Sequence, residues 1–214
     1  MARIEPFEKH PLRYEQWFDK HKFAYESELQ AIRKLLPQGG NGLEIGVGSG
    51  RFAVPLGIKL GIEPSSKMMQ IALRRGIEVI GGVAESLPFR NLQFDFALMV
   101  TTICFLDNVE VAFNEAYRIL KPDGCLIIGF IDKDSPVGQL YQQHKYESVF
   151  YKIATFYSVD EVVSCLKKAK FNGFDFSQTI FHNLAEMEGI ELVREGYGEG
   201  SFVVVRAVKM TTQV

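Results

Sequence analysis

A short glycine-rich stretch carries the pattern with the most chemical content in this chain. It reads GLEIGVGSG over residues 42–50, with Gly46, Gly48 and Gly50 following an apolar strand end. Glycine suits a backbone that must turn tightly and let a ligand approach to contact distance, because it has no Cβ. In an α/β protein, such a loop after a first strand is the usual site of a nucleotide cofactor. The sequence therefore predicts a cofactor-binding loop here.

Two acidic residues flank this loop and indicate the charge of its ligand. Glu44 stands two residues before Gly46, where its carboxylate would repel a pyrophosphate and attract a cationic ammonium group. Glu63 ends a second apolar run, and a carboxylate there can accept two hydrogen bonds from a ribose diol. The dinucleotide fingerprint G-x-G-x-x-G would need its third glycine at position 51, which is Arg51. The pattern therefore favours a positively charged nucleoside over a dinucleotide.

The glycine loop and its two acids resemble the class I S-adenosylmethionine-dependent methyltransferases, most of all the type 11 domain of ubiquinone- and menaquinone-biosynthesis-like enzymes. The resemblance covers residues 36–131. It includes NEAYRILKPDGCLII, which is similar to the family's E-x-x-R-V-L-K-P-G-G passage between a helix and the fifth strand. It implies S-adenosyl-L-methionine as the cofactor, with the glycine loop around its methionine part and Glu63 on its ribose.

A second motif in the same region concerns the adenine. GGVAESLPF, residues 81–89, resembles the family's G-D-A-E-x-L-P-F segment, which lies over that base. Val83 stands where the family commonly has an aspartate that reads the adenine amino group, so Glu85 or backbone groups would have to supply this contact. On this resemblance, the predicted cofactor-binding residues are Glu44, Gly46, Gly48, Gly50, Glu63, Pro64, Ala84, Glu85 and Thr101.

The acceptor side of the reaction is less clearly encoded. After the apolar strand FDFALMV the chain reads TTIC, without the N-P-P-Y or D-P-P-Y motif of enzymes that act on planar amide or adenine nitrogens. The aromatic residues of segment 132–157 would suit an apolar or cation-like acceptor. His144 is a candidate base there, although a lone histidine is more often structural. These features favour methyl transfer to oxygen, nitrogen or carbon of a small molecule.

Two alternatives stay open on the sequence alone. Val83 and the connection of only 13 residues from Gly50 to Glu63 leave room for a protein that binds S-adenosylmethionine without turnover. A nicotinamide-dependent oxidoreductase would use a similar strand order, but its fingerprint is missing here and it would have to tolerate Glu44.

The composition of the chain limits its expected domain count, partners and cellular compartment. A chain of 214 residues with a net charge of −2 and dispersed charges predicts one domain and no nucleic-acid partner. The apolar stretches are only strand-length, and the N-terminal MARIEPFEKH carries charges throughout, so we expect neither a membrane span nor a signal peptide. The three cysteines have no metal-ligand spacing, which predicts a reducing, cytoplasmic setting and no metal.

The resemblance also implies the elements that position these residues. We expect an α/β, Rossmann-like three-layer sandwich whose mostly parallel seven-stranded sheet has the order 3-2-1-4-5-7-6, the last strand antiparallel. Helices are expected over residues 14–36, 66–75, 109–120 and 159–169, the second capped by Ser65 and the last by a Ser158/Glu161 capping box. The single domain 1–214 would comprise a helical lid (1–36), a cofactor-binding core (37–131), an acceptor-site insertion (132–157) and a C-terminal helix and strand pair (158–214).

Overall fold

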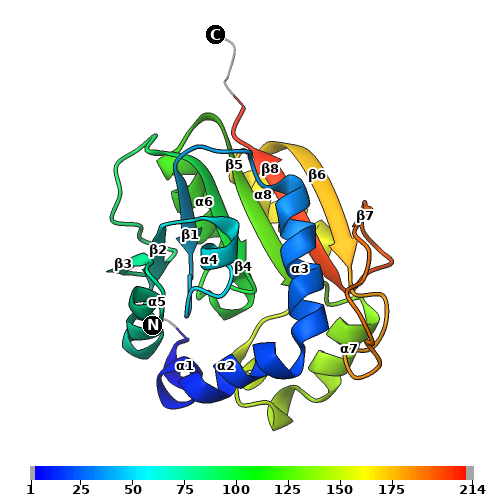
Figure 1. Cartoon of the computed structure of the whole chain (residues 1–214). Coiled ribbons are helices and arrows are strands. Elements are labelled where there is room, and N and C mark those ends of the chain that lie inside the picture. Colours follow the sequence, from blue (N-terminus) through cyan, green and yellow to red (C-terminus); the bar gives the residue numbers. More distant parts are fainter. Residues whose placement is uncertain (1–2, 211–214) are drawn as a thin grey trace.

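A mostly parallel sheet separates two layers of helices in the computed structural model, which describes residues 3–210 (Figure 1). The strands are β1 (Gly42–Ile45), β2 (Leu60–Glu63), β3 (Glu78–Gly81), β4 (Phe94–Val100), β5 (Leu120–Ile131), β6 (Asn172–Thr179), β7 (Arg194–Glu195) and β8 (Phe202–Val208). Their order is β3-β2-β1-β4-β5-β8-β6-β7, with β8 antiparallel to both its neighbours. The predicted order is therefore confirmed, β8 being the seventh strand foreseen, and the two-residue β7 is an addition at the edge.

Helices cover both faces of this sheet. They are α1 (Glu5–Lys9), α2 (Pro11–Lys20), α3 (Lys22–Leu35), α4 (Ala53–Leu56), α5 (Ser66–Arg74), α6 (Val109–Ile119), α7 (Pro136–Gln143) and α8 (Val159–Lys168). α6 and α8 pack in the core on one face, and α3 and α4 pack in the core on the other. Met99 of β4 lies in the first core and Leu98 in the second, which explains why this strand is a continuous apolar run.

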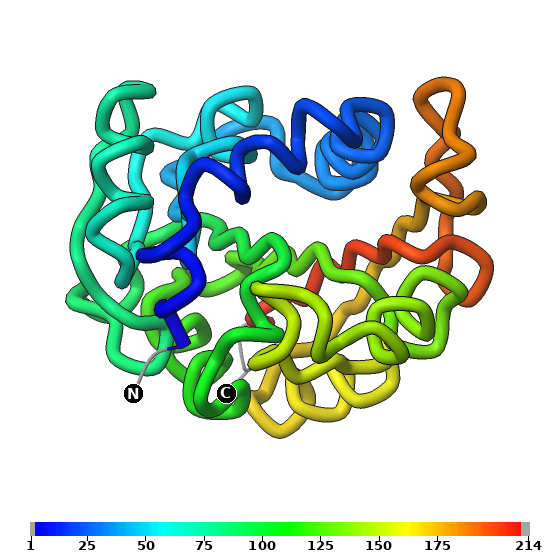
Figure 2. The backbone as a smooth tube through the Cα atoms, turned by 90° about the horizontal axis from the view of Figure 1, so that it is seen from below, coloured from blue at the N-terminus to red at the C-terminus, as the bar shows by residue number. Residues whose placement is uncertain are grey.

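The N-terminal segment differs from the prediction. The single helix expected over residues 14–36 is wrong, because His21 has a non-helical backbone (φ −112°, ψ 47°) that separates α2 from α3. His10 likewise separates α1 from α2. These two breaks let α1 and α2 lie along the edge where the parallel strands end, while α3 runs along the sheet face (Figures 1 and 2).

The two helix caps predicted from the sequence are confirmed. The Ser65 hydroxyl accepts from the Met68 amide and caps α5, and Ser158 and Glu161 form both bonds of the predicted capping box at α8. Segment 132–157 forms α7 and two short 3₁₀ turns, Lys145–Glu147 and Tyr151–Ile153. This segment lies at the same edge of the sheet as α1 and α2 (Figure 2). The glycine loop lies at that edge too.

Candidate functional site

The glycine loop after β1 turns at the carboxyl edge of the sheet. Gly46 and Gly48 have φ values of +74° and +54°, a backbone region that disfavours residues with a Cβ. A Cβ on Gly46 would lie 2.5 Å from Cγ2 of Thr102. The amides of Gly46 and Val47 both donate to the Ile62 carbonyl, at 2.8 and 2.9 Å, so the loop is tied directly to β2.

Glu63, at the end of β2, holds the loop from the other side. Its carboxylate accepts from the backbone amides of Gly48 and Ser65, each at 2.8 Å. One bond goes to each oxygen, so both oxygens keep a lone pair for a further donor. Burial raises the pKa of Glu63 to about 7. The hydrogen bonds from the two backbone amides lower the pKa but do not offset the effect of burial.

A cavity of about 90 Å³ lies over this loop. Seven of the nine residues predicted for cofactor binding line it: Gly46, Gly48, Glu63, Pro64, Ala84, Glu85 and Thr101. Val83 also lines it, and so presents an apolar side chain where the family commonly has an aspartate. Glu85 accepts from the amides of Asp107 and Asn108, at 2.8 and 3.2 Å, and therefore also fixes the segment after β4.

The other two predicted residues lie outside the lining of this cavity. Gly50 packs against α5, since a Cβ there would lie 3.6 Å from Cβ of Ala72. Glu44 is 1% exposed, and burial raises its pKa well above the usual range, with repulsion from Glu63 adding to the effect. Its Oε2 has no hydrogen-bond partner among residues 3–210. Such a buried, unmatched carboxylate oxygen behind the glycine loop suits a cofactor that carries an ammonium group.

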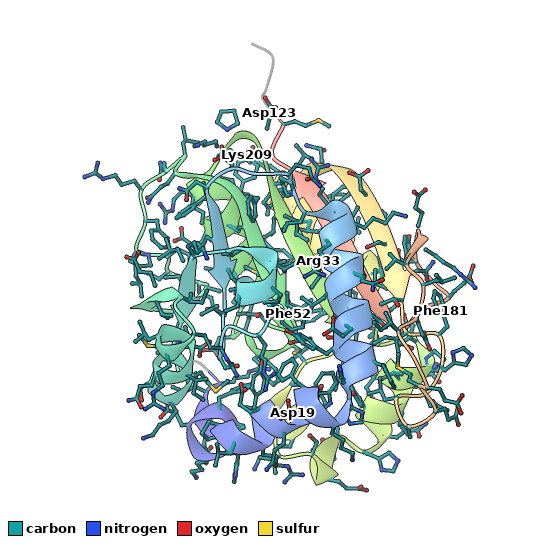
Figure 3. The ribbon with its side chains drawn as sticks, in the orientation of Figure 1. Asp19, Arg33, Phe52, Asp123, Phe181 and Lys209 are labelled. Atoms are coloured by element: carbon teal, nitrogen blue, oxygen red, sulfur yellow. The ribbon has the colours of Figure 1, made fainter. Side chains whose placement is uncertain are left out.

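The first two helices cover this cavity, and the sequence did not predict their contacts. Glu8 of α1 accepts from the Ser65 hydroxyl at 2.7 Å and from the Lys67 amide at 3.2 Å, at the start of α5. Arg51, next to the loop, donates to Glu15 of α2 at 2.9 Å and lies 3.4 Å from Asp19, which is labelled in Figure 3. The ion pairs of Arg51 attach α2 to the loop, and the hydrogen bonds of Glu8 attach α1 to the start of α5.

A second, larger cavity of about 210 Å³ adjoins the first. The two share Phe7, Tyr14, Thr101 and Phe105 as lining residues. Aromatic rings dominate the rest of its wall, including Trp17, Phe18, Phe52, Tyr141, Phe150 and Tyr151. Phe52 lies beside α4 in the interior of the molecule (Figure 3). The wall therefore combines α1 and α2 with segment 132–157.

Thr101 stands where the two cavities meet and has an unusual backbone. Its φ is +49°, which is rare for a β-branched residue and costs on the order of 1–3 kcal/mol. Its amide donates to the Gly129 carbonyl of β5 at 2.7 Å, which helps to hold this conformation. Strained residues of this kind occur mostly at functional sites.

The remaining candidate from the sequence is His144, the candidate base. His144 lies outside the lining of both cavities, with an exposed side chain whose Nδ1 is 3.2 Å from Glu147. Burial of its sulfur raises the pKa of the partly exposed Cys104 to about 12, which keeps the thiol protonated and unsuited to act as a nucleophile. Among residues 3–210 there is no cluster of three metal-ligating side chains.

Buried carboxyl groups make stability depend on pH. Burial raises the pKa of Glu28, on α3, to about 8 from an ordinary 4.5. Between these values the folded protein keeps a proton that the unfolded chain has released, so rising pH favours unfolding until about pH 8. This proton uptake lowers the free energy of unfolding by on the order of 4 kcal/mol between pH 4.5 and 8, and we expect the Glu28→Gln variant to lack this decrease. Denaturant titrations at intervals of pH test this, and parallel profiles for both proteins would contradict it.

Comparison with known proteins agrees with this geometry. A family model described as a methyltransferase domain matches residues 43–128. The chain is 45% identical to an uncharacterised protein of Methanocaldococcus jannaschii, over 95% of this chain and 98% of that protein. It is 26% identical to the 2-methoxy-6-polyprenyl-1,4-benzoquinol methylase of Xenopus laevis, over 65% of this chain and 48% of that enzyme.

A solved structure gives the strongest evidence of family. A crystal structure from Thermotoga maritima, described as a SAM-dependent methyltransferase and possible histamine N-methyltransferase, is 54% identical, with a TM-score of 0.93 over 95% of this chain and 98% of that one. No helix within residues 3–210 is long and apolar enough to cross a membrane. The nicotinamide oxidoreductase alternative is overturned by this likeness. The chain belongs to the S-adenosylmethionine-dependent methyltransferases, and its residues 43–128 match the methyltransferase domain model.

Proposed function

We propose that this enzyme transfers a methyl group from S-adenosylmethionine to a small-molecule acceptor, with the cofactor in the first cavity and the acceptor in the second. The observation that carries the proposal is the shared wall: Phe7, Tyr14, Thr101 and Phe105 line both cavities. Bound S-adenosylmethionine supplies a methyl group on a positively charged sulfur, ready for in-line displacement. The protein must hold an acceptor lone pair in line with it and exclude water.

The cofactor residues have distinct tasks in this proposal. Gly46 and Gly48 let the backbone approach the methionine part, while Glu63 accepts hydrogen bonds from the ribose hydroxyls with its two remaining lone pairs. Glu44 lies beneath the loop and outside the cavity wall, where the ammonium group of the cofactor would favour its ionised form without a direct contact. Pro64, Ala84, Glu85 and Thr101 complete the wall.

The flanking segments belong to the acceptor side. Residues 1–36 act as a lid, since Phe7 and Tyr14 line both cavities and Glu8 and Glu15 attach the lid to α5 and the loop. Residues 132–157 form the acceptor-binding insertion through Tyr141, Phe150 and Tyr151, leaving residues 37–131 as the cofactor core. The three cysteines are free thiols, which supports a reducing, cytoplasmic setting.

The acceptor atom can be oxygen, nitrogen or carbon. The quinol methylase and the possible histamine methyltransferase among the similar proteins have very different acceptors by name. An acidic phenol or an activated carbon needs no strong base, whereas an amine must lose a proton by the end of the reaction. His144 lies outside both cavities, so it has no direct route to the acceptor.

Two measurements test the proposal in sequence. Isothermal calorimetry should show micromolar binding of S-adenosylhomocysteine and no binding of NADH. Transfer of a labelled methyl group should then be measured over small amines, phenols and quinols. Binding without transfer to any of them would leave a cofactor-binding protein without turnover, and absence of binding would overturn the proposal altogether.

A further inference from the structure

One buried acid in the second cavity has no structural partner. Glu28 of α3 is 3% exposed and lines this cavity. Its carboxylate makes no hydrogen bond or ion pair with any residue in the described range 3–210, and its neighbours on the helix are packed apolar side chains such as Leu29. A buried carboxyl group without a partner is costly, so its position calls for a ligand or a proton.

Aromatic rings surround this carboxylate. Glu28, Tyr141 and Tyr151 line the same cavity, together with Trp17. The rings of Tyr141 and Tyr151 stack with centroids 4.6 Å apart. Electron-rich ring faces around a single acid form the arrangement that binds organic ammonium groups, by cation–π attraction and ion pairing together.

The charges around the cavity agree with a cationic ligand. Arg13 is the one basic residue among the lining residues in the described part of the chain, and its side chain is exposed. It makes no ion pair with Glu28 in the described part of the chain, so it does not neutralise that carboxyl group. A ligand with a positive nitrogen would therefore meet an acid whose charge no protein group balances.

We propose that the acceptor carries a cationic nitrogen, and that Glu28, with the rings of Trp17, Tyr141 and Tyr151, binds this nitrogen in the second cavity. The inference rests on the proposed function and narrows its acceptor class to amines. Without a ligand, burial keeps the pKa of Glu28 near 8 and the group largely protonated at neutral pH. A bound ammonium group favours the ionised carboxylate, so ligand and acid stabilise each other's charge.

Matched pairs of amine and alcohol test the proposal. The protein is first saturated with S-adenosylhomocysteine, and calorimetry then compares propylamine, 2-phenylethylamine and tryptamine with the neutral alcohol of the same skeleton. We expect at least one amine to bind about tenfold or more tightly than its alcohol. In Glu28→Gln this preference should disappear, while the affinity for S-adenosylhomocysteine stays unchanged.

Controls separate this inference from the proposed function. Glu26→Gln makes the same change of charge on α3 at a residue outside the cavity lining, and it should keep the preference. Thermal unfolding verifies that both variants fold. Equal affinity for amine and alcohol, a preference that persists in Glu28→Gln, or no amine binding at all would overturn the inference. In each of these cases, binding of S-adenosylhomocysteine and methyl transfer to a neutral phenol would still support the proposed function.

Discussion

Glu63→Ala is expected to weaken S-adenosylhomocysteine binding by about 2 kcal/mol or more, roughly thirtyfold in the dissociation constant. Two effects add in this variant. The ribose hydroxyls lose a charged acceptor, and charge-assisted bonds are the stronger kind. The glycine loop also loses an anchor, because the same carboxylate accepts from the amides of Gly48 and Ser65 at 2.8 Å.

Calorimetry with S-adenosylhomocysteine measures the effect, and two further variants interpret it. Glu78→Ala removes an exposed acid from the neighbouring strand β3 and should leave the affinity unchanged. Glu63→Gln keeps the shape of the side chain, so its affinity for S-adenosylhomocysteine should lie between those of Glu63→Ala and the natural protein. An unchanged dissociation constant in a folded Glu63→Ala variant would refute the ribose assignment.

The sequence predicted the cofactor half because its signals are local. The glycine spacing, the apolar run of β4 and the caps at Ser65 and Ser158 each depend on residues a few positions apart. Strand order followed from the family resemblance and needed no knowledge of side-chain contacts. Only β7, with two residues, gave no signal, since a strand of that length has no measurable periodicity.

The acceptor half depends on contacts between distant parts of the chain. Phe7 and Tyr14 meet Phe150 with ring centroids 5.3 and 6.2 Å apart, although more than 130 residues separate them in sequence. The aromatic residues of the N-terminal segment suit a packed core as well as a lid, and no local pattern decides between these. Glu28 gave no signal at all, because one acid on a helix is normally exposed and only the tertiary fold buries it.

Glu44 shows a different limit of sequence reasoning. Its position before the loop predicted a carboxylate that faces the ligand, and the structure buries this side chain behind the loop, outside the cavity wall. Strand alternation does not reveal this, because β1 is buried on both faces and either side of it is interior.

Gly46→Ala is expected to abolish cofactor binding, with at least about a hundredfold loss in affinity for S-adenosylhomocysteine. The new Cβ would lie 2.5 Å from Cγ2 and 2.7 Å from Oγ1 of Thr102, so the loop or the segment after β4 must move. The variant should also lose roughly 2–4 kcal/mol of stability, from the positive φ of +74° and the overlap together.

Gly57→Ala supplies the matched control for this prediction. Gly57 ends α4 with φ +75°, nearly the same as Gly46, but a Cβ there would have no heavy atom within 4 Å. It should therefore cost only the backbone strain, about 1 kcal/mol, and leave binding intact. Calorimetry measures cofactor binding and denaturant unfolding measures stability. Comparing the two variants by both methods separates the effect of backbone strain from that of steric overlap with Thr102. If the two variants bound S-adenosylhomocysteine equally well, close approach at Gly46 would not be what the cofactor site requires.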